Sequence, residues 1–437
     1  MPDLVTGPEP SSPTEPDAAL PSLWRNRPYL LLMTGKTTQL VGAGIGAFAV
    51  PLIAYAVTGS VAQAGLIAAI GQVGGLITAL PAGVVADRVD RRKLIIGCAV
   101  VGAVTWAAVA LAGLLGVLAG WHLAVALLVS GVVTSFVNPA EAAALRVVVP
   151  TPQLASAMAA VQGRSAVASL IAGPVGGLLY GIGHVVPILA SAIGELVVAT
   201  TTWLIKVPLN ERAEPDPDRH PVTDLVEGLR YVWQVPLLRA TIGLFALVNL
   251  SVSGLLIAIT LELVQIGTPP VLIGVIELVS GAGMLIGSLF AGRLLDRVRV
   301  GPITITALVL LSAGCAGMAL LRSYPAYLIL LFIPILLAPA LNAGMLGYVA
   351  AITPDALQGR LNSALSLTWL LSAPVAPVVG SQLLAAFGIG PTLWAFAALL
   401  LLTTVAISLV RPLWRIGLPP TWADDAISWP RDRASRR

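Results

Sequence analysis

The chain contains a succession of apolar segments, each long enough to cross a lipid bilayer as a helix. Such a helix needs about 20 mostly apolar residues. Twelve segments meet this requirement, at 28–57, 62–86, 94–117, 122–143, 154–181, 186–206, 238–264, 271–295, 302–321, 326–350, 359–386 and 391–411. Glycine and proline inside them do not exclude spanning helices, because neighbouring helices satisfy the freed backbone groups. The pattern predicts an all-α membrane protein with twelve transmembrane helices.

The composition agrees with a protein whose surroundings are lipid. Only 11% of the residues are charged, whereas soluble domains contain about 25% charged residues. The net charge of +4 does not indicate nucleic-acid binding, because the placement of the charges matters more than their sum, and we expect no nucleic-acid partner. Cys98 and Cys315 lie in apolar segments without partners at the spacing of a disulfide or metal site. We therefore expect both to be packing residues.

Basic residues gather on one side of the predicted membrane, which indicates the orientation of the chain. With a cytosolic N-terminus, the cytosolic connections contain Arg25, Arg27, the run from Arg88 to Lys93, Arg146, Lys206 to Arg239, Arg293 to Arg299 and the tail from Arg411. The opposite side keeps only Arg322. We therefore expect both termini to be cytosolic. The excess of arginine over lysine suggests a GC-rich bacterial genome, and hence the bacterial cytoplasmic membrane.

The longest connection divides the spans into two groups of six. The predicted regions are a disordered cytosolic tail at 1–27, a six-helix half at 28–206, a cytosolic connection at 207–237, a second six-helix half at 238–411 and a basic cytosolic tail at 412–437. Residues 1–21 are proline-rich and acidic and do not have the pattern of a signal peptide. In the connection, Leu225, Leu229 and Val232 share one helical face, which predicts a short helix on the membrane surface.

One short charged motif occurs in both halves. AGVVADRVD at 82–90 matches AGRLLDRVR at 291–299, and the match pairs Gly83 with Gly292, Asp87 with Asp296 and Arg88 with Arg297. A second match pairs Asn138 with Asn342 and Pro150 with Pro354. We place these matches in the 2–3 and 4–5 loops of each half. Two parallel six-helix repeats are an architecture of transporters, with the substrate path between the halves.

These motifs resemble the major facilitator superfamily, and in particular its bacterial drug-exporter-like branch. The 2–3 loop supplies Gly83, Asp87, Arg88, Arg91 and Arg92 of the family's signature, with Asp90 where the family prefers glycine. AGPVGG at 172–177 resembles the exporters' fifth-helix motif through Gly173, Pro174, Gly176 and Gly177, although it is one residue shorter. The segments at 138–150, 225–239 and 353–363 resemble the branch's 4–5 loop, interdomain helix and 10–11 loop. The matches together span residues 24–411.

The resemblance implies a gate at the charged 2–3 loop. In the family's outward-open state, Asp87 at the end of the second helix would contact the facing end of the eleventh helix. Gly83 would let the two helices approach closely, as small residues do in lipid. A simpler interpretation is that the loop only anchors the topology. A magnesium site at Asp87 and Asp90 is disfavoured, because the matching loop has Arg299 at the partner position, and we expect no metal.

Five ionisable residues lie within predicted spans, where charge is costly and points to function. They are Lys36, Arg164, Glu195, Glu262 and Glu277. Arg164 and Glu195 lie at matching depths on sequential helices, which predicts either a structural ion pair or a proton relay. Glu277 has no cation nearby in its own half, so desolvation should favour its protonated form. It is a candidate proton carrier, or else a protonated acid that is hydrogen-bonded to a neighbouring helix.

Two further residues are candidates for the central cavity. Lys36 could contact an anionic group of a substrate or pair with Glu141. Asn249, in the middle of the seventh helix, could face the cavity or make a structural interhelical hydrogen bond. The exporter branch often carries an acid at the position that Ala43 occupies here.

The resemblance and the residues together predict a secondary active transporter. We expect it to export small amphipathic molecules, such as drugs, antibiotics, siderophores or other secondary metabolites, by proton antiport with alternating access. We expect a transporter rather than an enzyme. It is not expected to be an ATPase, because the chain lacks the Gly-rich phosphate-binding loop. We expect no cofactor, and we expect a monomer whose partners are the substrate, protons and the bilayer. The alternatives are a solute:proton symporter that imports, and a membrane scaffold or signalling protein of the same fold.

Overall fold

The computed structural model describes residues 22–210, 230, 233–354, 357–359, 361, 365–366 and 372–425. This described part of the chain is helical and contains no strand. The predicted helix that carries Leu225, Leu229 and Val232 lies outside the described residues, as do residues 1–21 and 426–437. The predicted fold class, an all-α membrane protein of two six-helix repeats, is confirmed.

The first half consists of six long helices. They are α1 (Arg27–Thr58), α2 (Val61–Arg88), α3 (Arg91–Leu114), α4 (Gly120–Val148), α5 (Leu154–Ile182) and α6 (Val186–Leu204). Polar side chains start three of them, because Asn26, Ser60 and Asp90 accept hydrogen bonds from the first-turn amides of α1, α2 and α3. Asn26 also donates to the carbonyl of Val148, which holds the start of α1 against the end of α4.

The second half repeats this plan with one span broken into two helices. Its helices are α8 (Pro236–Gln265), α9 (Pro270–Leu295), α10 (Val300–Leu321), α11 (Tyr324–Ile335), α12 (Ala338–Ile352), α14 (Val375–Phe387) and α15 (Ile389–Ser408). Helices α11 and α12 follow one another through residues 324–352 as a single span. Pro334 and Pro339 flank the break between them, since proline removes a backbone hydrogen bond of the helix.

Eleven helices of the described part are long and apolar enough to cross a membrane. The remaining predicted span, 359–386, is represented by α14, a shorter apolar helix, and the segment before it includes residues outside the description. The predicted fourth span, 122–143, was too short. Its alanine-rich end continues the helix to Val148, because alanine has the highest helix propensity.

The structure also corrects the placement of the second repeated motif in the loops. Asn138 lies inside α4 and Asn342 inside α12, so neither belongs to a loop. The corresponding connections begin after Val148 and Ile352. The two asparagines still occupy equivalent positions in the two halves.

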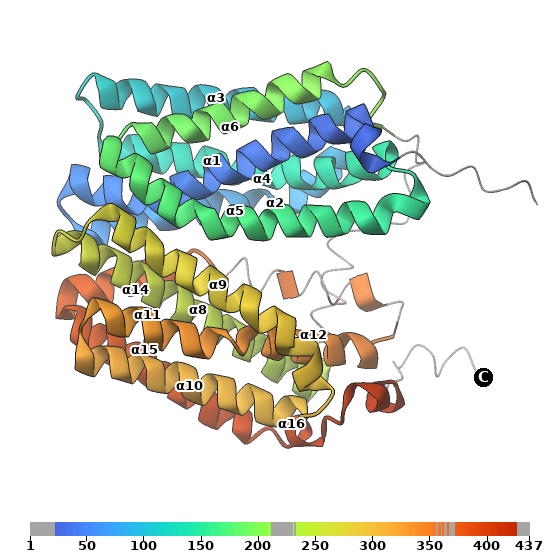
Figure 1. The fold of residues 1–437 in the computed structure, drawn as a ribbon, viewed down its shortest axis with the longest axis vertical. Helices are drawn as coiled ribbons and strands as arrows, with labels where there is room; N and C mark the ends of the chain where they lie inside the picture. Colours follow the sequence, from blue (N-terminus) through green and yellow to red (C-terminus); the bar gives the residue numbers. More distant parts are fainter. Residues whose placement is uncertain are drawn as a thin grey trace, which may run out of the picture.

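The halves form two adjacent bundles (Figure 1), with α5 and α9 at the boundary in front. Helix α5 packs against α9, and α2 packs against α14. These two helix pairs are the main contacts between the halves.

The buried apolar core is shared between the halves at one end of the molecule only. The largest cluster joins Phe48 and Leu52 of α1 to Leu255 and Ile259 of α8. Its members lie towards the helix ends that are joined by the connections between α1 and α2, between α5 and α6, and between α8 and α9. At the opposite end, each cluster of buried apolar residues belongs to one half alone. Among the described residues, the halves therefore share a buried apolar core at one end only.

The chain after the last span folds back onto the second half. Helix α16 (Arg411–Arg415) and the 3-10 helix η3 (Pro419–Asp425) lie within the region predicted as a tail. Leu413 is fully buried and its carbonyl approaches Gly301 of α10. Trp422 packs edge to face on Tyr348 of α12, whose hydroxyl donates to Asp425. The tail is thus structured as far as residue 425.

Candidate functional site

Helices α5 and α9 meet through glycine, so their backbones are almost in contact. A Cβ at Gly177 would collide with the carbonyl oxygen of Pro270, and one at Gly274 would collide with that of Gly173. Towards the middle of the helices, a Cβ at Gly281 would lie 3.0 Å from Leu170. Small residues permit this approach between helices in lipid. We call this contact, from Gly177 and Pro270 to Leu170 and Gly281, the α5–α9 seam.

The fifth-helix motif faces in two directions. Gly173 and Gly177 are one turn apart and face α9, whereas a Cβ at Gly176 would lie 2.7 Å from the ring of Phe48 in α1. Pro174 lies inside α5 between them. The motif therefore allows α5 to pack tightly within its own half and against the other half at the same height.

Glu277 lies directly in the α5–α9 seam. A Cβ at Gly173 would lie 2.8 Å from the Cβ and from Oε2 of Glu277. Within the described residues, Glu277 takes part in no ion pair and no hydrogen bond. The sequence placed this acid away from cations in its own half, and the structure adds that it contacts a glycine of the other half.

A second contact between the halves joins α2 to α14. A Cβ at Gly65 would collide with the Ser381 hydroxyl and would lie 2.7 Å from the carbonyl oxygen of Pro377. Close by, Nε2 of Gln382 donates to the carbonyl oxygen of Ala62 at 3.4 Å. This α2–α14 seam lies near the start of α2, and no sequence motif marked Gly65.

At the opposite end of the molecule, three glycines of these helices have no close neighbour among the described residues. A Cβ at Gly163 of α5 or at Gly292 of α9 would meet no described atom within 4 Å. The same holds for Gly83 of α2. The facing end of the predicted eleventh helix includes residues outside the description, so its predicted close approach to the second helix at Gly83 stays a prediction. The side chain of Asp87 lies outside the description, so its predicted contact stays a prediction.

The other charges of the 2–3 motif act within the first half. The Arg91 side chain donates to the carbonyl of Leu209 at 3.1 Å, and the Arg92 side chain donates to that of Trp203 near the end of α6. Asp90 caps α3 through the amide of Lys93. Arg88 ends α2 and is exposed. In the second copy of the motif, Asp296 and Arg297 are also exposed, and Asp296 is the C-cap residue of α9.

A network of polar side chains lies between α1, α4 and α6. Lys36 Nζ is 2.7 Å from Oε2 of Glu141, and it also donates to Gln39 at 2.9 Å and to Asn138 at 3.0 Å. The Lys36 and Glu141 side chains are 13% and 14% exposed. An ammonium group has three N–H donors, so all three are used. Pairing with Glu141, one of the two alternatives for Lys36, is the arrangement found.

The predicted ion pair between Arg164 and Glu195 is wrong. Glu195 accepts two hydrogen bonds from Nε2 of Gln39, at 3.1 and 3.0 Å, and packs on Gly102 of α3. Arg164 Nη1 instead donates to the carbonyl oxygen of Met33 at 3.3 Å. Equal depth brought the two residues to one level but did not fix which face of each helix they occupy.

Three candidate groups remain apart from this network. Arg164 Nε and Asn249 Nδ2 are buried without a hydrogen-bond partner among the described residues. Asn249 Oδ1 accepts from Ser253 at 3.0 Å, which is a contact within α8 rather than an interhelical bond. Glu262 lies near the end of α8.

The sequence analysis did not identify Gln39 and Asn138 as members of this network. Gln39 bridges Lys36 and Glu195, and Asn138, which lies within the predicted fourth span, accepts a hydrogen bond from Lys36. Gln39 lies one turn after Lys36, so helical spacing could have associated them. The positions of Glu141 and Asn138, three residues apart on one helix, carried the same indication.

A family model described as Major Facilitator Superfamily matches residues 32–264 and 241–425. Among proteins of similar sequence, Macrolide efflux protein A of Streptococcus pyogenes is 25% identical over 281 residues, which cover 62% of this chain and 67% of that protein. Multidrug efflux pump Tap of Mycolicibacterium fortuitum is 26% identical over 415 residues, covering 88% of this chain and 96% of that one.

Solved structures with the same fold include the nucleoside transporter NupG, with a TM-score of 0.72 at 11% identity over 89% of this chain and 100% of that one. A bacterial homologue of the human lysosomal transporter Spinster, in an inward-facing and occupied conformation, has a TM-score of 0.71 at 15% identity. It covers 93% of this chain and 99% of its own.

Proposed function

This chain belongs to the Major Facilitator Superfamily, and we propose that it exports small amphipathic molecules across the cytoplasmic membrane of a bacterium in exchange for protons. Relatives named as a macrolide efflux protein and a multidrug efflux pump support export. The apolar composition of the chain, 57% hydrophobic residues, favours substrates with a large apolar part. We further propose that one chain is the functional unit and that both termini are cytosolic.

Alternating access is supported by the asymmetry between the two ends of the molecule. One end of the molecule contains the connections between α1 and α2 and between α8 and α9. The α5–α9 seam, the α2–α14 seam and the shared apolar core all lie at that end. The positive-inside rule assigns that end to the outside, because the 2–3 connection and its basic residues lie at the other. We therefore propose that this conformation is closed on the outer side of the membrane.

Glu277 is our proposed proton carrier, and its contact with Gly173 is the observation that carries this mechanism. The seam that holds it must come apart when the outer end opens, and water then reaches the carboxyl group. Burial in the closed seam disfavours the charged carboxylate. Protonation from outside would therefore allow the seam to close, and release of the proton to the cytosolic cavity would complete the cycle. Such a difference between states is what coupling requires.

The polar network of the first half has a structural role in this proposal. The three donors of Lys36 are used by protein acceptors, so an anionic substrate would have to displace one of them. Glu195 is held by Gln39 away from the seam. Asn249 keeps a buried Nδ2 without a partner, and we propose it as a hydrogen-bond donor to substrate in the cavity.

Accumulation of ethidium and of a panel of antibiotics in a pump-deficient bacterial strain tests this function. Expression of the chain should lower accumulation, and an uncoupler should abolish the difference. Higher accumulation on expression would indicate the importing symporter instead. Equal accumulation of all compounds, with the protein present in the membrane, would contradict transport of this class of substrate. Gly181→Ala is a suitable control variant, because a Cβ there meets nothing within 4 Å.

A further inference from the structure

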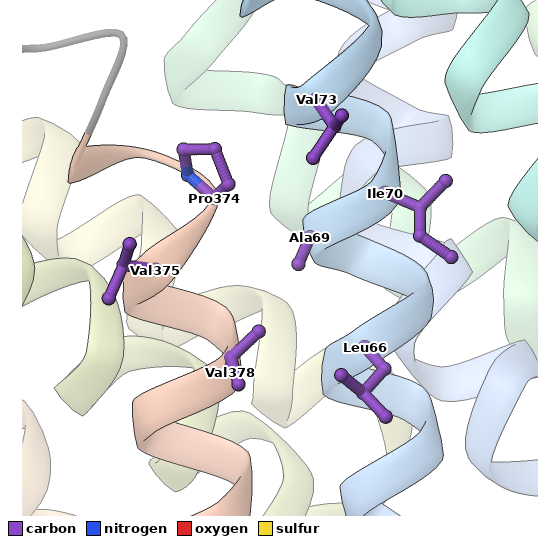
Figure 2. A pocket seen from close by; sticks show the side chains of 7 residues that line it. All are labelled: Leu66, Ala69, Ile70, Val73, Pro374, Val375 and Val378. Atoms are coloured by element: carbon purple, nitrogen blue, oxygen red, sulfur yellow. The ribbon is translucent and has the colours of Figure 1, made fainter.

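An apolar groove lies between the halves beside the α2–α14 seam. It has a volume of about 470 Å³, within the range of about 300–1,000 Å³ that is typical of small-molecule sites. The walls include Leu66, Ala69, Ile70 and Val73 of α2 and Val375 and Val378 of α14. Figure 2 shows Leu66 and Ala69 pointing towards α14, and Val378 pointing back towards α2. Every lining side chain is apolar, so water gains no hydrogen bond there.

The groove lies at the depth of the acyl chains. Leu66 and Val73 are five and twelve residues from the first residue of α2, or about 8 and 18 Å along a helix that rises 1.5 Å per residue. The hydrocarbon core of a bilayer is about 30 Å thick. Leu66 is 45% exposed and Val375 is 47% exposed. An occupant of the groove must therefore present an apolar surface.

A second, more polar hollow adjoins the groove at the start of α2. It has a volume of about 330 Å³, shares Leu66 with the groove and is also lined by Thr58, Gln63 and Trp121. Trp121 is 64% exposed, and tryptophan is enriched at the membrane–water interface. The apolar groove continues into a more polar hollow near the interface. Together they match an amphipathic molecule, whose apolar part would lie in the groove and whose polar group would lie in the hollow.

The two walls of the groove belong to different halves. Gly65 and Ser381 of the α2–α14 seam immediately adjoin Leu66 and Val378. Relative movement of the halves must therefore change the width of the groove in each transport cycle. A permanently bound lipid would be expelled by such a movement, whereas a transported molecule would be expected to enter and leave.

We propose that the groove between α2 and α14 is a binding site for the apolar part of an amphipathic molecule, which exchanges there directly with the bilayer. The adjoining hollow at Gln63 and Trp121 receives its polar group. This inference rests on the proposed function, to which it adds a lateral site and a substrate class defined by an apolar chain with a polar end.

Photolabelling of the protein in proteoliposomes tests the site without requiring transport. The probe is a dodecyl trimethylammonium analogue with a diazirine in its chain, and unlabelled dodecyltrimethylammonium is the competitor. Labelling should concentrate on residues 66–73 and 375–378 and should be displaced by the competitor. Val73→Thr keeps the side-chain volume but adds a hydroxyl group that an apolar occupant cannot pair, and labelling should fall at least five-fold. Ile77→Thr is the matched control, because Ile77 is 68% exposed on the same helix outside the groove.

Three results would overturn the site. They are labelling that is spread evenly over exposed positions such as Ile77, labelling that the competitor does not displace, and equal labelling of Val73→Thr and wild type. A groove that holds membrane lipid would instead be labelled by a diazirine phosphatidylglycerol and not cleared by the alkylammonium, which also contradicts the proposal.

A transport measurement separates the site from the proposed function. Val378→Trp narrows the groove, and export of the membrane-partitioning dye Hoechst 33342 should fall at least five-fold while the variant remains monodisperse in detergent. Displaceable labelling of the groove in a wild-type protein that exports no dye would leave the site standing and remove the exporter function. Dye export by the wild type without displaceable labelling would do the reverse.

Discussion

The two halves of this protein hold their intramembrane charges in opposite ways. In the first half, Lys36 is bound by Glu141, Gln39 and Asn138. Gln39 in turn donates a hydrogen bond to Glu195. In the second half, Glu277 stands against Gly173 of the other half without a hydrogen bond or ion pair among the described residues. A network whose donors are all used stabilises one arrangement of helices, whereas an isolated acid in a contact that opens and closes can change its protonation. The comparison assigns stability to the first set of charges and coupling to the second.

The largest effect should come from closing the space that Glu277 occupies. In Gly173→Ala, the added Cβ would lie 2.8 Å from Glu277 and from the Gly274 carbonyl, so the α5–α9 seam cannot close as it does here. We expect ethidium efflux to be lost. Gly181→Ala in the same helix should transport normally, because alanine stabilises a helix interior relative to glycine by about 0.5–1 kcal/mol. Normal efflux by Gly173→Ala would show that the seam is not needed.

The repeated 2–3 motif offers a second comparison between the halves. Asp87→Asn should reduce efflux about ten-fold at normal abundance in the membrane, if the family's gate forms at this loop. A charge near a helix terminus contributes only about 0.3–1 kcal/mol, so folding should be nearly unaffected. Asp296→Asn at the exposed equivalent position should change efflux less than two-fold. Efflux of Asp87→Asn within two-fold of the wild type would leave the loop as a topological anchor.

Removing Lys36 should destabilise the first half. In Lys36→Met, the Glu141 carboxylate would lose its cation while it stays largely buried, and breaking such a pair costs about 3–5 kcal/mol. The melting temperature in detergent should fall markedly, and the double variant Lys36→Met with Glu141→Leu should recover part of the loss. Lys93→Met removes an exposed lysine and should leave the melting temperature unchanged. A wild-type melting temperature in Lys36→Met would show that the network does not stabilise the first half.

The smallest effect is an expected absence of coupling between Arg164 and Glu195. Because these residues have different partners, the losses of stability in Arg164→Met and Glu195→Gln should add to within about 0.5 kcal/mol in the double variant. Thermal unfolding of the two single variants and the double variant measures this. A double variant that is more stable than the sum predicts would restore the ion pair expected from the sequence.

The sequence was sufficient for features that depend on one helix at a time. The length of each apolar segment predicted the eleven spans that the structure describes, because segment length is a local property. The division at 207–237 stays a prediction. The repeated Gly-xxx-Asp-Arg motif and the GPVGG stretch at 173–177 likewise indicated the family before any contact was known.

Features that depend on which helix faces interact were not predictable in this way. Arg164 and Glu195 share a depth, but helix rotation directs one to Met33 and the other to Gln39. Glu277 lies 104 residues from Gly173, and only the packing of the two halves brings them together. Gly65 carries no motif, so the second seam required the structure.

Proton movement that depends on Glu277 is the central claim, and substrate-driven proton flux in proteoliposomes tests it most directly. With an internal pH-sensitive dye, an imposed ethidium gradient should drive proton flux through the wild type. Glu277→Gln mimics the protonated acid, so it should still exchange ethidium down its gradient while proton flux is lost. Glu262→Gln, an acid of the same half outside the seam, should keep both activities. Proton flux near the wild-type rate in Glu277→Gln would contradict the account and direct attention to Glu195 or Glu262.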